Sequence, residues 1–452
     1  MNPFATPVKD ACSIFSAALE RVDPLAMMKR VVRLEGDTLR IETETEARAF
    51  DLRNFDRILA FGAGKASARM ALGLEAILGE RLAGGVVVVK TGHGERLARI
   101  QLLEASHPVP DASSLTAAKA LLSLGQGTDV RTLFLGLTSG GGSALLCAPL
   151  PGLSLEDKQE TTRILLGCGA SIREINCVRK HLSAIKGGRL AAALAPATVV
   201  NLILSDVIGD DLSAIASGIT TPDPTRYADA LDILRRFKVL EGVPKAARQL
   251  LEGGQAGHSP DTPKPGDPLF ERTHNLIIGS NHQAVRAAQA KAQELGYTTL
   301  ILTSRLEGEA REAGRFLMAI AEDVRDRNHP LAPPACLLCG GETTVTLRGP
   351  GKGGRNQELA LAALAHCEQE PERLRHITLL SAGTDGNDGP TDAAGAFACS
   401  EVLAQAQSCG LVASEYLARN DSYSYFEQLD GHLKTGPTNT NVCDLQVLIV
   451  AD

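Results

Sequence analysis

The chain has 452 residues, 44 of them glycine, with 4% aromatic residues and a formal net charge of −7. A chain of this length exceeds one ordinary hydrophobic core, so two domains are expected. Its charges are mixed in sign, and no basic block is interleaved with aromatic residues, which argues against a nucleic-acid partner.

The N-terminal residues MNPFATPVKDACSIF lack a basic start followed by an apolar run, so no secretory signal is expected. The longest apolar runs are too short to span a bilayer. Ten scattered cysteines are typical of reduced thiols, and the pair Cys336 and Cys339 is interpreted as two buried strand thiols rather than half a metal site. We therefore expect a cytoplasmic protein without membrane contact.

Short apolar runs without strict alternation recur along the whole chain and are separated by helix-like segments. Such runs predict parallel strands that are buried on both faces and joined by helical crossovers. The fold class is therefore α/β. In chain order the predicted strands are 57–61, 85–89, 132–137, 199–204, 276–279, 298–303, 335–339, 377–383 and 445–450.

Two helices and one domain boundary are predicted from local signals. Apolar residues at spacings of three and four mark a sheet-packing helix over 307–324, and Asp223 with Pro224 is interpreted as the cap and first turn of a helix that continues through 227–237. The Gly- and Pro-rich segment 253–273 predicts the boundary. The expected domains are residues 1–255 and 256–452.

The first glycine turn, FGAGKASARM at 61–70, follows a predicted strand and begins a helix. It fits neither the dinucleotide fingerprint nor a P-loop, since Ser67 replaces the third glycine of the first and Ala66 the Ser or Thr of the second. Gly64, Lys65 and Ser67 are therefore predicted to bind an anion at the helix start, the alternative being a surface lysine after a tight turn.

The second glycine turn, LTSGGGSALL at 137–146, lies between a predicted strand and a predicted helix. Its backbone N–H groups would face the space beyond the sheet, where phosphate or carboxylate is commonly held. The predicted binding residues are Ser139, Gly140, Gly141, Gly142 and Ser143.

Three carboxylates, Asp206, Asp210 and Asp211, follow the strand at 199–204 in LSDVIGDDLSAIASG. Ligands in open α/β sheets lie beyond the carboxyl ends of the strands, so these acids are predicted to hold Mg²⁺ or to accept a hydroxyl proton. Capping of the next helix is the alternative, and at least one of the three is expected to do so.

The helix-like segment 171–191 carries five basic residues, among them Lys180 and Lys186. A charge-rich helix is commonly a solvated face. If this helix lines the ligand site, Lys180 and Lys186 complement phosphate groups.

In the second half, GGETTVTLRGPGKGGRNQELALA places Lys352, Arg355 and Asn356 at the start of a predicted helix, where an Arg fork can bind phosphate or carboxylate. The segment SAGTDGNDGPTDAAG follows another strand and contributes Asp385 and Asp388. Asp385 and Asp388 are candidate metal ligands together with Asp206 and Asp210, and ordinary turn residues are the alternative.

Eight segments in order, FGAGKAS, SHPVPD, LTSGGGSALL, INCVRKHLSAIKGGRLA, LSDVIGDD, ASGITTPDPT, GGETTVTLRGPGKGGRNQE and SAGTDGNDGPTDAAGA, resemble the class II glycerate 2-kinase family. The resemblance implies a Rossmann-like α/β/α N-terminal domain, a smaller α/β C-terminal domain of the MOFRL type, and an active site in the cleft between them.

The resemblance also implies the reaction. Members transfer the γ-phosphoryl group of ATP to the C2 hydroxyl of D-glycerate with Mg²⁺, and the family's active-site lysine and arginine match Lys65 and Arg355. Asp206 is our addition to this catalytic set. A hydroxypyruvate reductase that uses NAD(P)H and a non-catalytic sugar-acid sensor are the alternatives, and a homodimeric assembly is left open.

Overall fold

The computed structural model describes residues 6–452 and divides into two compact units. The first unit is Pro24–Ile278, and the second combines the chain up to Asp23 with Gly279–Asp452. The chain thus passes from the first unit to the second after residue 278, not at the predicted position between residues 255 and 256. The N-terminal segment also joins the unit formed by the C-terminal half.

The first unit is built on a six-stranded sheet of order β6-β5-β4-β7-β8-β9. The neighbouring pairs from β6 to β8 are all parallel, as the apolar runs predicted. Their bounds are β4 Arg57–Ala63, β5 Gly84–Lys90, β6 Ile100–Ala105, β7 Thr132–Thr138, β8 Thr198–Leu204 and β9 Thr273–Gly279.

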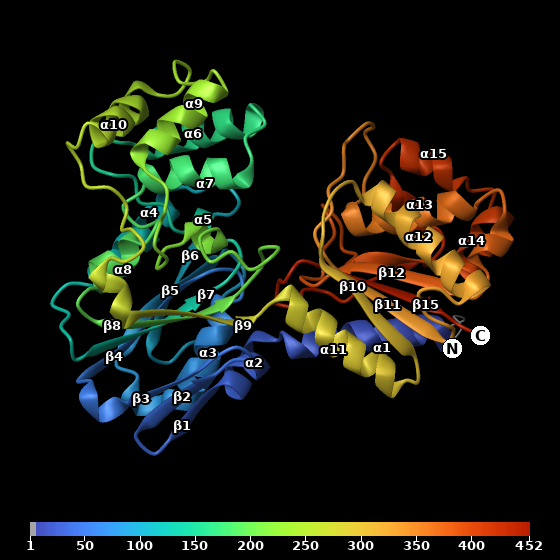
Figure 1. Cartoon of the computed structure of the whole chain (residues 1–452), viewed down its shortest axis with the longest axis horizontal. Coiled ribbons are helices and arrows are strands. Elements are labelled where there is room, and N and C mark those ends of the chain that lie inside the picture. Colours follow the sequence, from blue (N-terminus) through green and yellow to red (C-terminus); the bar gives the residue numbers. More distant parts are fainter. Residues whose placement is uncertain (1–5) are drawn as a thin grey trace. The chain divides into compact units, whose positions relative to one another are not determined.

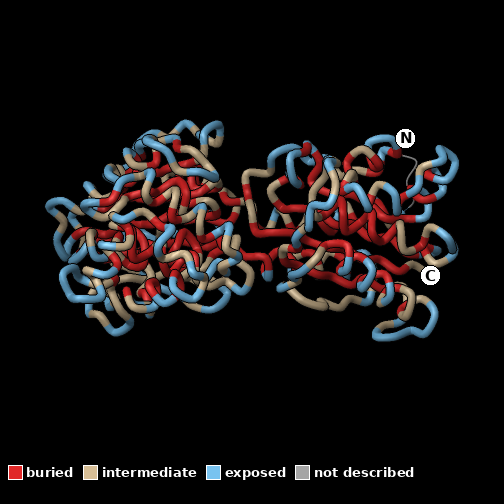
Figure 2. Tube along the Cα trace, turned by 90° about the horizontal axis from the view of Figure 1, so that it is seen from above, coloured by how far each residue is buried: buried red, intermediate tan, exposed pale blue. Residues whose placement is uncertain are grey.

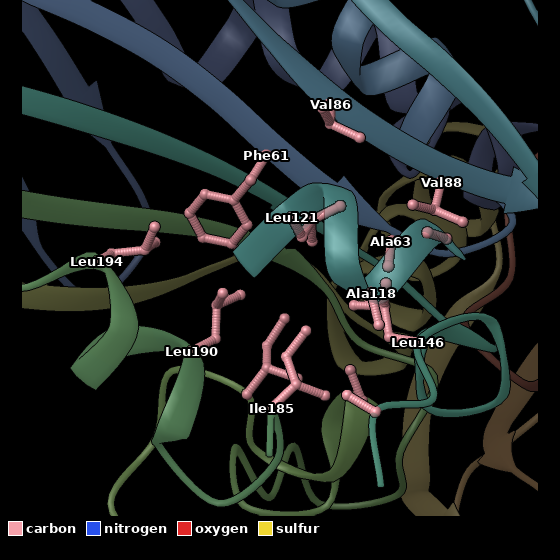
Figure 3. Packing of buried hydrophobic residues seen from close by; sticks show 14 of the residues in the cluster. Phe61, Ala63, Val86, Val88, Ala118, Leu121, Leu146, Ile185, Leu190 and Leu194 are labelled. Atoms are coloured by element: carbon pink, nitrogen blue, oxygen red, sulfur yellow. The ribbon is translucent and has the colours of Figure 1, made fainter. Parts of the chain in front are cut away.

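Helices cover both faces of this sheet (Figure 1). The helices α4 (Ala112–Ser123), α5 (Gly142–Leu145) and α8 (Arg189–Leu194) lie on one face, and α2 (Pro24–Val31) and α3 (Ser67–Leu78) lie on the other. Figure 3 shows the core beneath the first set, where Phe61 and Val88 of the strands meet Leu121 of α4 and Leu190 of α8. The two-faced covering confirms the α/β/α expectation.

Two further parts complete the first unit. The strands β1 (Val32–Glu35), β2 (Thr38–Glu42) and β3 (Ala47–Asp51) form a small antiparallel sheet. The helices α6 (Leu155–Gly167), α7 (Ile172–His181), α9 (Tyr227–Arg236) and α10 (Lys245–Gln255) gather into a helical group with its own apolar core (Figure 1).

The predicted start of α9 at Asp223 is wrong. The helix begins at Tyr227, where the Asp229 carboxylate accepts a hydrogen bond of 2.7 Å from the Arg226 N–H. Asp223 is fully buried and its carboxylate instead accepts hydrogen bonds from the hydroxyls of Thr225 and Thr262. The local sequence around Asp223 cannot show that the distant Thr262 will donate a hydrogen bond to the Asp223 carboxylate.

The Gly- and Pro-rich segment predicted as the boundary packs on the first unit. Asp261 accepts a hydrogen bond from the buried His181 ring, and the Pro263 carbonyl accepts one from the Asp223 N–H. Strand β9 then joins the first sheet. There the side-chain oxygen of Asn275 accepts hydrogen bonds from the Asn201 side chain and the Thr220 hydroxyl. These long-range contacts extend the unit to Ile278.

The second unit contains a mixed sheet of order β10-β11-β15-β12-β13-β14. Strands β10 and β11 are parallel, but β15 runs antiparallel to both β11 and β12, which corrects the expectation of parallel strands for this half. The bounds are β10 Thr298–Leu306, β11 Ala335–Gly341, β12 Ile377–Gly383, β13 Gly395–Cys399, β14 His432–Leu433 and β15 Asp444–Val450.

Helices α1 (Thr6–Arg21) and α11 (Asn281–Glu294) pack together on this mixed sheet, and α12 (Ala310–Arg327) packs with α13 (Arg355–Cys367) on the other face (Figure 1). The predicted helix over 307–324 is confirmed as α12. Three short helices, α14 (Ser400–Ser408), α15 (Ala413–Ala418) and α16 (Ser422–Glu427), complete the unit. Each unit has its own buried interior (Figure 2).

Cys336 and Cys339 are buried in β11, as predicted.

Among residues 6–452, no helix is both long enough and apolar enough to cross a membrane.

Candidate active site

Three neighbouring parallel strands end at one edge of the first sheet. Ala63 at the end of β4 is in register with Thr138 at the end of β7, and Thr138 is in register with Ile203 near the end of β8. The sheet order therefore brings both glycine turns and Asp206 to the same edge.

The two glycine turns are joined by hydrogen bonds. The Lys65 N–H donates to the Gly140 carbonyl at 2.9 Å, and the Ser139 N–H donates to the Ala63 carbonyl at 3.1 Å. The Ser139 hydroxyl accepts from the Ala66 N–H at 3.0 Å, and the Ser67 hydroxyl donates to the Leu137 carbonyl at 2.7 Å. Both hydroxyls are buried, so the structure gives Ser67 and Ser139 internal partners rather than an open face toward a ligand.

Gly64 makes the close approach of the turns feasible. Its φ is +147°, and a Cβ atom built on it would lie 2.1 Å from the Ser139 hydroxyl oxygen. Glycine alone fits such a position, because any side chain would collide with the neighbouring turn.

The SGGGS turn leads into a helix of a single turn. Gly141 adopts the left-handed region with φ of 84°, and α5 spans only the four residues Gly142–Leu145. The turn uses the Gly142 N–H for a bond to the Ser139 carbonyl. A single helical turn contributes little dipole, so anion binding here would rest on the individual amides.

Basic and imidazole side chains surround this turn. A Cβ built on Gly141 would lie 3.1 Å from the His107 ring and 3.6 Å from Lys65 Cγ, so both side chains lie against the turn. Burial, together with the charges of Lys65 and Lys90, lowers the pKa of His107 to about 4. His107 is therefore neutral at pH 7. Sequence reasoning missed it, although SHPVPD was recognised as a motif.

Asp206 lies directly against the second glycine turn. A Cβ built on Gly140 would lie 2.1 Å from Asp206 Oδ2. Asp210 occupies a turn with φ of 59°, and Asp211 accepts a 2.9 Å hydrogen bond from the Ser213 N–H. The expectation that one of the three acids caps the next helix is wrong: Asp211 closes only a local turn, and the following 3-10 turn Ile215–Ser217 has no side-chain cap.

The basic residues after α6 are largely internal. Lys180 is buried and forms an ion pair with the buried Asp223, Nζ to Oδ1 3.5 Å. Lys186 is also buried and donates to the Ser143 carbonyl at 2.6 Å and to its hydroxyl at 2.9 Å. Lys180 is therefore paired with Asp223, whereas Lys186 lies at the end of the SGGGS turn.

In the second unit, Arg355 is the first residue of α13 and its guanidinium contacts two carboxylates. Its Nε and Nη2 donate to Asp444 at 2.6 and 2.9 Å, and its Nη1 lies 2.7 Å from Glu342. Burial disfavours the charge of Arg355, but the Asp444 and Glu342 carboxylates stabilise that charge more strongly and raise the pKa of Arg355. Burial raises the pKa of Asp444 to about 6, against the pull of Arg355.

Asp444 and Glu342 were missed from the sequence. Asp444 is the first residue of β15 and Glu342 directly follows β11, and neither lies in a recognisable spacing with Arg355. Only the register Gly341 to Asp444 in the antiparallel pair brings them together.

Asp388 and Asn356 stabilise the start of α13. The Asp388 carboxylate is buried and accepts hydrogen bonds from the N–H groups of Asn356 and Gln357 at 3.0 and 2.9 Å. The Asn356 side chain accepts from the Ser381 hydroxyl at 2.7 Å. Both residues thus have internal partners. Asp385 lies at the nearby end of β12, where a Cβ on Gly383 would be 3.5 Å from its Oδ1.

Across residues 6–452, no group of three or more His, Cys, Asp and Glu side chains is arranged to hold a metal ion. Asp206 and Asp385 are therefore individual acids near the ends of β8 and β12, in different units.

Two family models match the chain. The model described as a domain of unknown function (DUF4147) matches residues 10–252, and the model described as the MOFRL family matches residues 335–444. The first match falls largely within the first unit and the second falls within the second unit.

Curated relatives match nearly the whole chain. It is 40% identical over 434 residues to a glycerate 2-kinase from Pyrococcus horikoshii, which covers 96% of this chain and 95% of the relative. It is 42% identical over 396 residues to an Agrobacterium vitis protein named "Putative hydroxypyruvate reductase". That match covers 87% of this chain and 87% of the relative. The crystal structure of glycerate kinase from Thermotoga maritima matches with a TM-score of 0.85 at 38% identity, covering 98% of this chain and 99% of that one.

Proposed function

Because the chain belongs to the glycerate kinase family, whose members are ATP-dependent kinases, we propose that it transfers the γ-phosphoryl group of ATP to the C2 hydroxyl of D-glycerate. The products are 2-phosphoglycerate and ADP. The position of the transfer is part of the proposal.

The observation that carries this proposal is the meeting of Lys65, the SGGGS turn and Asp206 at one edge of the first sheet. Phosphoryl transfer requires positioning and neutralisation of charge more than covalent chemistry from the protein. A lysine, a turn with backbone amides and a carboxylate supply these requirements.

Each of the three elements has a proposed role. Lys65 neutralises charge on the transferring phosphoryl group, and the amides of Gly140 and Gly141 bind a phosphate or carboxylate oxygen. Asp206 accepts the proton of the attacking hydroxyl or holds Mg²⁺. These roles fit the positions of the side chains against the glycine turn.

Mg²⁺ is the proposed metal. It commonly binds through one or two carboxylates together with the substrate phosphates, and in the first unit Asp206 is the proposed carboxylate. When bound, it would neutralise charge on the nucleotide phosphates. Asp388 is left out of this set because its oxygens already accept two backbone hydrogen bonds.

Arg355 is proposed as the second cationic group of the reaction. Two carboxylates hold its guanidinium in one orientation, so less side-chain entropy is lost when it meets an anion. The Nε and Nη2 edge is used by Asp444 and Nη1 also contacts Glu342, so the substrate contact is assigned to the N–H groups of Nη1 and Nη2 that point away from these two carboxylates.

The test is the position of phosphorylation. Enolase converts 2-phosphoglycerate, and not 3-phosphoglycerate, to phosphoenolpyruvate. We expect purified protein with ATP, Mg²⁺, D-glycerate and enolase to yield phosphoenolpyruvate without phosphoglycerate mutase. Formation of phosphoenolpyruvate only after mutase is added would identify a 3-kinase.

A reductase is the competing function, because one relative carries that name. The second strand of the sheet, β5, ends at Lys90, where a dinucleotide-binding fold commonly places an acid for the ribose hydroxyls. The same preparation should therefore fail to oxidise NADH or NADPH with hydroxypyruvate. Turnover there, without ADP formation from glycerate, would favour the reductase.

A further inference from the structure

Two basic side chains contact Ser143 at the end of the SGGGS turn, and a third, Lys158, lies within electrostatic range of both. We call Lys158 of α6, Arg179 of α7 and Lys186 the inner cation cluster. Arg179 Nη2 and Lys186 Nζ donate to the Ser143 hydroxyl at 2.8 and 2.9 Å. Lys158 is 6% exposed, and its Nζ has no hydrogen-bond partner within the described part of the chain.

The groups that bind the inner cation cluster are neutral. The Ser143 hydroxyl lies 2.7 Å from the Ser217 hydroxyl, which donates to the Asn176 side chain at 3.1 Å. Within residues 6–452, no carboxylate forms an ion pair with Lys158, Arg179 or Lys186. Acidic residues on the same two helices are engaged elsewhere: Asp157 with Ser154, Glu160 with Arg163, and Glu174 with Ser171 and Arg236.

Burial of several cations without a counter-charge is unfavourable. Burial lowers the pKa of Lys158 to about 8, and burial with the charges of Arg179 and Lys158 lowers the pKa of Lys186 well below its usual value. An anion beside Ser143 would supply the missing charge. Ser143 and Arg179 are only partly buried, so the cluster can be reached from solvent.

We propose that the inner cation cluster is an oxyanion-binding site, which holds a carboxylate or phosphate group of the kinase substrates beside the SGGGS turn. The choice of ligand rests on the proposed function, and the presence of an anion site rests on the cluster itself. Lys158 and Arg179 join Lys186 as ligand-binding residues, whereas Lys180 pairs with Asp223.

The test compares Lys158→Met and Arg179→Met with Lys119→Met, a matched control at an exposed position of α4. Calorimetry measures the binding of three separate probes: D-glycerate, a non-hydrolysable ATP analogue with Mg²⁺, and inorganic phosphate. We expect both cluster variants to lose roughly tenfold or more in affinity for at least one probe, as for a lost charged hydrogen bond. Lys119→Met should bind all three like the wild type.

The probe that is affected identifies the source of the oxyanion. A loss confined to D-glycerate assigns the carboxylate, and a loss for the nucleotide analogue assigns a phosphate. Unchanged affinity for all three probes in both variants would overturn the proposal. So would a Lys158→Met variant with a lower melting temperature and unchanged affinity, because methionine should fill a purely anion-binding position without loss of stability.

The proposed kinase function is tested separately, by measuring ADP formation by the wild type. A wild type that makes no ADP, yet binds phosphate in a Lys158-dependent way, would remove the kinase assignment and leave the anion site. An active wild type whose cluster variants keep all affinities would remove the anion site alone.

Discussion

Lys65 combines two functions in one residue. Its backbone N–H joins the two glycine turns through the Gly140 carbonyl, while its side chain lies over Gly141. Lys65→Ala removes only the side chain, so we expect the melting temperature to stay unchanged. The value of kcat/KM should fall about 100-fold or more, as when a preorganised electrostatic partner is lost. Steady-state kinetics and thermal unfolding check both, and near-wild-type turnover would make Lys65 a surface residue.

Asp444 should set the acid limit of activity. Its pKa of about 6 lies above its ordinary value of 3.8, so the folded state binds more protons and stability falls as pH rises between these values. Below about pH 6 the carboxyl is protonated and no longer orients Arg355 by charge. We expect kcat/KM to fall on the acid side with a midpoint near that pKa.

Asp444→Asn is the matched variant for this pH dependence. It is neutral at every pH, so its activity should be low and the acid limb near pH 6 should disappear. In urea unfolding, the free energy of unfolding of the wild type should fall between pH 4 and 6, and that fall should be absent in the variant. An acid limb that persists unchanged in the variant would assign it to another group.

At the scale of the elements, the approach of the β7 turn to the β8 turn depends on Gly140. Its φ is not in the left-handed region, so the glycine is required by space rather than by conformation. Gly140→Ala would place a methyl group 2.1 Å from Asp206 Oδ2, and we expect it to displace this carboxylate. The rate should fall as far as in Asp206→Asn, with the variant still folded.

Gly167→Ala, at the end of α6, is the control for this substitution, because a Cβ there meets nothing within 4 Å. It should keep full activity. Circular dichroism and kcat measured on the three variants separate displacement of Asp206 from a general effect of added volume. Full activity in Gly140→Ala would mean that the position of Asp206 is unimportant.

At the scale of the whole molecule, the N-terminal helix folds with the C-terminal half. Phe15 of α1 is buried in the second unit, where α1 packs on α11, β12 and β15. Phe15→Ala should lower the free energy of unfolding of this unit by about 3 kcal/mol or more through loss of burial and cavity formation.

Hydrogen exchange locates the effect. Amides of β12 and β15 should lose protection in Phe15→Ala, whereas those of β4 and β7 should not. Ser16→Ala, on the exposed side of the same helix, is the control and should leave both sets unchanged. Equal loss of protection in both units would contradict the division of the chain at Asp23.

The sequence determined the α/β class, all nine predicted strands, the helix α12 and the two glycine turns. These features are local: an apolar run, a helical spacing or a glycine pattern is contained within a few neighbouring residues. The neighbourhood of Lys65, the SGGGS turn and Asp206 also followed from sequence. Parallel strands end at one edge, so residues that follow them meet there.

Tertiary structure alone decided the remaining features, because each depends on which distant segments pack together. Antiparallel β15 brings Asp444 to Arg355, helix α7 brings Arg179 to Ser143, and helix α6 places Lys158 within electrostatic range of Arg179. The same packing placed α1 in the second unit and gave Ser67, Ser139 and Lys180 internal partners. A sequence shows which side chains are charged, but whether a charge meets a counter-ion, a hydroxyl or an open site is fixed by elements far away in the chain.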